Sequence, residues 1–121
     1  IFEGFPKDIL EEIKDGGMSV LSSDYEGISN SLLEAMGMGM PVVSTDCPCG
    51  GSRMCIQDGV NGLLVPVGQP DALCMAMERM AGEEDQAAKM GKEASKVRER
   101  FSLQSILKQW LDLLDEVQEG R

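Results

Sequence analysis

The fold class of this 121-residue chain can be read from residues 18–45, MSVLSSDYEGISNSLLEAMGMGMPVVST. Two short, mainly apolar runs, 18–22 and 41–45, have the length and continuous character of strands buried on both faces. Between them, Ser29 or Asn30 can cap a helix that ends near Gly37 or Gly39. The order strand, helix, strand predicts a parallel βαβ unit. The apolar positions expected on that helix are Leu32, Leu33, Ala35 and Met36.

Further elements extend this unit in both directions. Residues 63–65 follow the turn residues Asn61 and Gly62 and are predicted to form a third strand. Three strands are few for a doubly wound sheet, so we expect the chain to be a single fragment of an α/β domain. It would be a partial Rossmann-like parallel sheet with flanking helices, the second half of such a sheet. Helices are expected over residues 6–15, 52–57, 70–81, 84–99 and 102–118, with residues 84–121 forming a helical C-terminal extension.

The composition excludes several classes of function. Hydrophobic residues make up 42% and charged residues 26%, as in a globular domain. Eleven Lys and Arg against 21 Asp and Glu give a net charge of -10, which repels nucleic acid. The chain contains no His, so His-dependent nucleophilic sites and His-containing metal sites are excluded. It also lacks a run of roughly 20 apolar residues, the length that a membrane helix needs.

Cysteines and methionines give weaker signals. Cys47-x-Cys49 is a single pair, with Cys55 and Cys74 isolated, so we expect no metal site and reduced thiols, as in the cytoplasm. Cys47 and Cys49 are expected in a loop near the candidate ligand-binding site, where they can be exposed to solvent. Methionines on the predicted helix faces are interpreted as core residues: Met36, Met75, Met77 and Met80.

The candidate site lies in the stretch from Ser22 to Ala35, which leads from the end of a strand through a glycine-containing loop into a helix. Open α/β sheets bind ligands at this position, and free amides at a helix N-terminus accept phosphate. The Glu34 carboxylate, one turn inside the helix, can accept hydrogen bonds from vicinal ribose hydroxyls. Glu26 can face the other end of the same ligand. Two acceptors beside a phosphate site suit a nucleotide sugar, although a glutamate on a helix is more often simply solvated.

The spacing of Glu26 and Glu34 is an E-x7-E pattern, and the region around it resembles family 4 of the retaining GT-B glycosyltransferases. The resemblance extends over about four-fifths of the chain. The matching pieces are the Ser23…Glu26-Gly27 loop, Leu32-Leu33-Glu34-Ala35-Met36, Gly39…Pro41-Val42-Val43, Asp58-Gly59…Asn61-Gly62-Leu63-Leu64-Val65-Pro66 and Asp71-Ala72-Leu73.

This resemblance implies a role for each matching residue. In such enzymes the first glutamate lies near the donor sugar, which makes Glu26 the candidate catalytic residue. The second binds the ribose hydroxyls, which assigns that role to Glu34. The intervening backbone contacts sugar and diphosphate, so the remaining donor-binding residues are Gly27, Ile28, Ser29, Asn30, Ser31 and Leu32. The implied reaction is transfer of a sugar from a nucleotide diphosphate sugar to an acceptor with retained configuration, without metal or cofactor, and with a UDP-sugar favoured.

The sequence departs from the family's pattern at two positions and lacks one pair of basic residues. Ser29 stands where a second glycine is common, and its side chain can narrow the sugar pocket. Met54 stands where a glutamate is common, so it receives no role. Arg53 is expected to form a surface salt bridge rather than a phosphate contact. The Arg and Lys that stabilise the diphosphate in such enzymes have no counterpart here.

The chain begins at Ile1 in mid-pattern, which indicates a piece of a longer protein. The expected partners are therefore a nucleotide sugar and an N-terminal acceptor domain missing from this chain, and the chain alone is expected to be inactive. The resembling enzymes work in polysaccharide synthesis on the cytoplasmic side of a membrane, which implies a cytoplasmic parent that can associate peripherally with it. The alternative is a non-catalytic α/β interaction domain that keeps the fold without activity; a dinucleotide domain lacks its glycine fingerprint.

Overall fold

The computed structural model describes residues 7–120. Across these residues the sheet has three parallel strands in the order β1-β2-β3: β1 (Ser19–Leu21), β2 (Val42–Asp46) and β3 (Leu63–Pro66). Ser19 lies opposite Val42, and Val43 opposite Leu63. The predicted parallel α/β class is confirmed, and all three carboxyl ends meet at one edge of the sheet.

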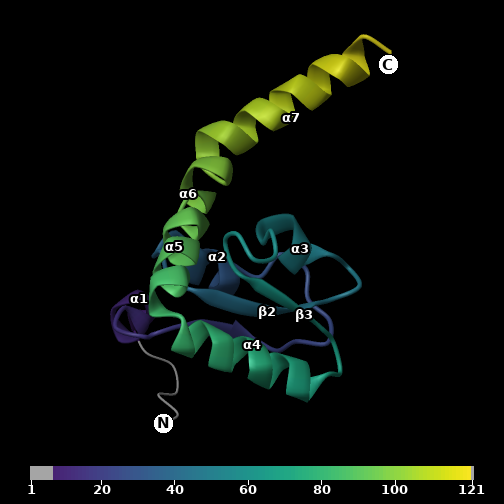
Figure 1. The fold of residues 1–121 in the computed structure, drawn as a ribbon. Coiled ribbons are helices and arrows are strands. Elements are labelled where there is room, and N and C mark those ends of the chain that lie inside the picture. The colour runs from purple at the N-terminus through teal and green to yellow at the C-terminus, as the bar shows by residue number, and fades with distance from the viewer. Residues whose placement is uncertain (1–6, 121) are drawn as a thin grey trace.

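Helices cover both faces of the sheet (Figure 1). The crossover helices α2 (Asn30–Gly37) and α3 (Gly51–Cys55) lie on one face, and α4 (Pro70–Gly82) lies on the other. Two helices in successive right-handed crossovers are expected on the same side of a parallel sheet. The Ser44 hydroxyl of β2 is 2.8 Å from the Ser52 hydroxyl of α3, which ties that helix to the sheet.

The core consists of two clusters separated by the sheet, because successive strand residues point to opposite faces. Val42 and Val43 are each 0% exposed, and each belongs to a different cluster. Burial of a valine on each face contributes roughly 1.5–3 kcal/mol per side chain. With Val42 lie Leu32, Ala35, Met36, Met40, Cys55, Ile56, Ala94 and Val97. With Val43 lie Leu63, Met80, Ala87 and Met90.

Two methionines were wrongly predicted to be core residues. Met36 and Met80 are buried, but Met75 is 68% exposed and Met77 38% exposed. Both lie on α4, whose sheet-facing side carries Met80 with Leu73 and Ala76. The apolar residues of this helix surround more of its circumference than the sheet can cover.

The remaining helices differ in detail from the prediction. Asp8 caps α1 (Ile9–Ile13) through the amides of Leu10 and Glu11. The helix predicted over 84–99 is divided into α5 (Glu84–Ala94) and α6 (Val97–Arg100). Gly91 allows α5 to pack closely against the backbone at Gly39, since a Cβ at position 91 would lie 2.1 Å from the carbonyl oxygen of Gly39.

Helix α7 (Leu103–Gln118) projects away from the sheet (Figure 1). Ser102 caps it by accepting a hydrogen bond from the Ser105 amide at 3.1 Å. Its predicted apolar face is present, but the helix has no buried residue. Leu103 is 74% exposed and Trp110 59% exposed. No helix within the described part of the chain is long and apolar enough to cross a membrane.

Candidate functional site

The loop between β1 and α2 ends in a side-chain cap. Ser29 is extended and only 8% exposed, and its hydroxyl accepts a hydrogen bond from the Leu32 amide at 3.4 Å. The Ser29 and Ser31 hydroxyls are 2.8 Å apart. The serine that replaces a common glycine is therefore the N-cap of α2. Of the amides predicted to contact the donor, that of Leu32 already has a partner in the free protein.

The two glutamates have different surroundings. The Glu26 carboxylate is half-buried and accepts a hydrogen bond from the Ser23 hydroxyl at 3.3 Å. Glu34 is exposed on α2, one turn from the N-terminus of that helix. The Ser23 contact holds Glu26 within its loop. Glu34, in contrast, presents its carboxylate to solvent.

The end of β2 holds this loop at its start, a contact that the sequence analysis missed. The Thr45 hydroxyl donates to the Ser23 carbonyl oxygen at 2.5 Å, and the Cys47 thiol donates to the same oxygen at 3.1 Å. The Cys49 thiol donates to the Glu26 carbonyl oxygen. Three side chains, one near the end of β2 and two just after that strand, therefore hold the backbone that carries Glu26. The only sequence signal for them was their position at a strand end.

A second contact holds the middle of the loop. The backbone of Gly51, at the start of α3, lies directly against Gly27 and Ile28. A Cβ at position 51 would lie 1.8 Å from the Gly27 carbonyl oxygen and 2.7 Å from the Ile28 nitrogen. Real Cβ atoms do not approach backbone so closely. Gly51 is therefore required by the path of the candidate donor loop.

Arg53 forms the predicted salt bridge with Asp46. Its Nε and one terminal nitrogen bind the two carboxylate oxygens at 2.9 and 2.6 Å. Hydrogen bonding to Asp46 raises the pKa of the Arg53 guanidinium. This two-point pairing directs the guanidinium toward Asp46 rather than a ligand.

The Asp58–Gly62 segment builds a turn. Asn61 accepts a hydrogen bond from the Gln57 amide at 2.7 Å and donates one to the Cys55 carbonyl at 3.1 Å. Asp58 accepts from the Leu64 amide at 2.9 Å. These contacts position the start of β3, so this matching motif has a structural role here.

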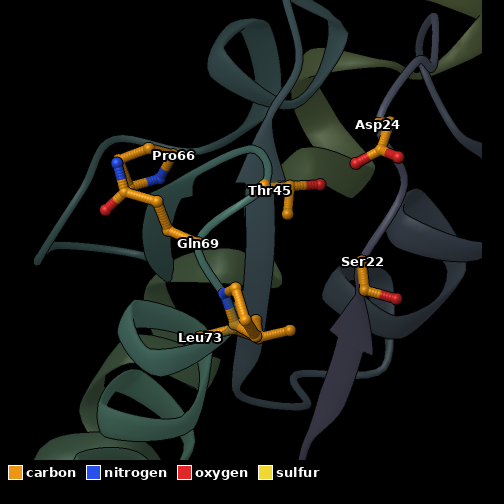
Figure 2. A pocket seen from close by; sticks show the side chains of 8 residues that line it. Ser22, Asp24, Thr45, Pro66, Gln69 and Leu73 are labelled. Atoms are coloured by element: carbon orange, nitrogen blue, oxygen red, sulfur yellow. The ribbon is translucent and has the colours of Figure 1, made fainter.

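A cavity of about 200 Å³ lies at the carboxyl edge of the sheet. Figure 2 shows Asp24 and Ser22 on one side of Thr45, with Pro66, Gln69 and Leu73 across from them. Neither Glu26 nor Glu34 is among its lining residues, which are Ser22, Asp24, Thr45, Pro66, Gly68, Gln69, Pro70 and Leu73. The loop after β1 thus contributes Ser22 and Asp24 to the cavity, whereas its Glu26 lies outside the lining. Within residues 7–120 no group of three acidic, Cys or His side chains could hold a metal ion.

The four cysteine thiols are expected to differ in their rate of alkylation, with exposed thiols reacting faster than buried ones. Cys49 and Cys74 are exposed, whereas Cys47, predicted to be open to exposure, is buried, as is Cys55. Burial raises the pKa of the Cys55 thiol, although Arg100 partly opposes this. Because alkylation requires the thiolate, iodoacetamide should label Cys49 and Cys74 first, as measured by peptide mass spectrometry. In urea, which unfolds the chain, iodoacetamide should label all four cysteines at the same rate. Equal labelling of Cys47 and Cys74 in the folded protein would contradict the structure.

Comparison with known proteins places this fold and loop in a family. The chain matches the family Glycosyl transferases group 1 over residues 1–83, and it belongs to that family. It is 34% identical over 112 residues to EpsD of Bacillus subtilis (strain 168), a protein named as a glycosyltransferase, covering 93% of this chain and 29% of that protein. It is 32% identical over 111 residues to the poly(ribitol-phosphate) alpha-N-acetylglucosaminyltransferase of Staphylococcus aureus (strain COL), covering 91% and 22%.

A solved structure shares the fold. The Anabaena protein HepE in complex with UDP matches with a TM-score of 0.85 and 26% identity, over 95% of this chain and 32% of that chain. This match confirms the Rossmann-like half-sheet of the GT-B type. The chain spans about a third or less of the length of each of these three proteins.

Proposed function

We propose that the protein containing this chain transfers a sugar from a nucleotide diphosphate sugar to an acceptor with retention of configuration. The observation that carries the proposal is the E-x7-E segment at the carboxyl end of β1, where α/β sheets bind ligands. Membership in the glycosyltransferase family supports it. A relative that is named as an alpha-transferase also favours retention.

Each end of the segment has a part in donor binding. Glu34, exposed one turn inside α2, accepts hydrogen bonds from the ribose hydroxyls. Glu26 lies near the donor sugar, held in its loop by Ser23. Between them, backbone amides over residues 27–31 bind the sugar and the diphosphate, helped by the positive end of α2. The Leu32 amide joins them only by giving up its bond to Ser29.

The chain by itself is expected to bind the donor without turning it over. Arg53, the first basic residue after the loop in sequence, is paired with Asp46, and a diphosphate leaving group needs positive charge. That charge and the acceptor site would come from other parts of the whole enzyme. We propose further that the enzyme needs no metal or cofactor. We place it in the cytoplasm, acting in polysaccharide synthesis at the membrane surface.

The nucleotide is expected to be UDP, the ligand bound by the Anabaena relative. The test is titration of the ¹⁵N-labelled chain with UDP, GDP and ADP, followed by amide NMR. UDP should shift the amides of residues 27–34 more than GDP or ADP at equal concentration. Shifts of equal size for all three, or shifts confined to other parts of the chain, would contradict the proposal. Sugar transfer by the isolated chain would contradict its expected inactivity.

A further inference from the structure

The C-terminal end of helix α2, the helix that carries Glu34, is held by a side chain of α6. The carbonyl groups of residues 34–36 accept hydrogen bonds from backbone amides that follow the helix, at 2.9–3.1 Å. The carbonyl of Gly37, the last residue of α2, accepts from Nε of Arg98, which lies 61 residues further along the chain. Because the last carbonyls of a helix have no partner within it, these bonds fix the position of its end.

Apolar contacts place the arginine at this point. Helices α5 and α6 run beside α2 (Figure 1). Val97, next to Arg98, is 6% exposed and belongs to the same core cluster as Met36 of α2. A Cβ at position 37 would lie 3.8 Å from Cγ of Arg98, so the apolar stem of the arginine passes over the end of α2. The packing of two helices and a hydrogen bond therefore meet at Gly37.

The two kinds of contact restrain α2 in different ways. Apolar burial has no preferred direction, so it holds the helix against the sheet but resists rotation and sliding weakly. A hydrogen bond is directional and weakens steeply when its angle changes. The bond from Arg98 to Gly37 therefore fixes the rotation and the axial position of α2. The positive guanidinium also lies at the negative end of the helix dipole, which adds to the stability of this arrangement.

The position of Gly37 determines the position of Glu34. The two residues are three apart on one helix, so they are neighbours on its surface. A rotation of α2 that moves the Gly37 carbonyl also moves the exposed Glu34 carboxylate. Arg98 lies at the end of α2 opposite to the amides proposed to bind the diphosphate. It acts through the helix, without contact with the nucleotide.

We propose that Arg98 is a positioning residue for nucleotide binding. Its hydrogen bond to Gly37 holds α2 in the orientation in which Glu34 meets the ribose hydroxyls. The proposal rests on the proposed function, because Glu34 belongs to that same site. It also makes the helical C-terminal extension part of the donor-binding unit. By linkage, displacement of α6 weakens nucleotide binding, and nucleotide binding changes the surroundings of Arg98.

The first test compares the UDP affinity of three variants, measured by amide NMR titration of the ¹⁵N-labelled chains. Arg98→Met removes the donor but keeps an apolar stem, and it should weaken UDP binding about three- to tenfold, the value of one net hydrogen bond. Because Arg98 is exposed, the fold should remain intact. Arg98→Lys, whose ammonium can donate to the same carbonyl, should restore most of the affinity.

Arg100→Met is the matched control. It removes the same charge from the same helix, but the Arg100 guanidinium lies 5.1 Å from the centre of the Phe101 ring rather than at α2. Its UDP affinity should equal that of the original chain. Equal losses in Arg98→Met and Arg100→Met would show that net charge governs binding, and the role of Arg98 would fail.

A double-mutant cycle separates positioning of Glu34 from a general loss of structure. In the Glu34→Gln background, Arg98→Met should cause no further loss of UDP affinity, because the carboxylate through which Arg98 acts is already neutral. A merely structural residue would weaken binding by the same factor in both backgrounds. The Nε–H resonance of Arg98 supplies a spectroscopic test. UDP should shift it in the original chain and leave the Nε–H resonance of Arg100 unchanged.

The outcomes distinguish this proposal from the proposed function. If UDP shifts residues 27–34 and binds Arg98→Met as tightly as the original chain, the positioning role is overturned and the proposed function stands. The same holds if Arg98→Met causes equal losses with Glu34 and with Gln at position 34. If UDP leaves residues 27–34 of the original chain unshifted, the proposed function is contradicted, and the role of Arg98 in nucleotide binding falls with it.

Discussion

Gly51→Ala should displace the candidate donor loop and weaken UDP binding by at least about tenfold. The new Cβ would lie 1.8 Å from the Gly27 carbonyl oxygen and 2.1 Å from the Gly27 carbonyl carbon. Both atoms are backbone, so no side-chain rotation relieves the clash. Overpacking of this kind costs about 1–3 kcal/mol of folding free energy. Displacement of the loop would also misplace the amides of Gly27 and Ile28, which the proposed function assigns to the donor.

Urea unfolding and UDP titration measure the two effects separately. Gly82→Ala is the matched control, because nothing lies within 4 Å of a Cβ there. As the last residue of α4, position 82 should accept alanine with unchanged or slightly higher stability. If Gly51→Ala and Gly82→Ala have the same stability and the same UDP affinity, the close approach of α3 to the loop is wrong.

Glu34→Gln should reduce UDP affinity by about 10–100-fold while leaving the fold intact. A hydrogen bond to a charged group is worth about 1.5–3 kcal/mol, and the ribose hydroxyls would lose their charged acceptor. Since Glu34 is exposed, its substitution should change stability by less than about 0.5 kcal/mol. The loss should be larger for UDP than for a free sugar, which has no ribose.

Glu78→Gln provides the control for this measurement. Glu78 is exposed on α4, and the substitution makes the same change in net charge. Its UDP affinity should equal that of the original chain. Equal losses in Glu34→Gln and Glu78→Gln would show that overall charge, rather than contact with ribose, governs nucleotide binding. The assignment of Glu34 would then fail.

Both predictions concern the segment from Glu26 to Glu34, and the loop at its start is supported by residues from another part of the chain. Ser23 receives the Thr45 hydroxyl from 22 residues away and the Cys47 thiol from 24 residues away. Because β1 and β2 are parallel, the loop after β1 and the residues after β2 emerge at the same edge of the sheet. The crossover through α2 therefore determines which residues support the loop.

The sequence by itself determined the order and type of most elements. Continuous apolar runs at 18–22, 41–45 and 63–65 marked the buried strands, because residues buried on both faces show no alternation. Ser29 was one of two expected caps, and the structure selects it. The E-x7-E spacing is also local, so its place at a strand end followed from the chain alone. These features depend on neighbours within about one helical turn or one strand.

Only the tertiary structure decided what each surface meets. An apolar pattern identifies a face of a helix, but it does not say whether another element covers that face. The faces of Met36 and Met80 are covered, whereas those of Met75 and Trp110 are exposed. Likewise, the requirement for glycine at position 51 arises from the path of a loop more than 20 residues earlier. Such contacts depend on distances between segments that the chain brings together only on folding, and no local pattern of residues encodes them.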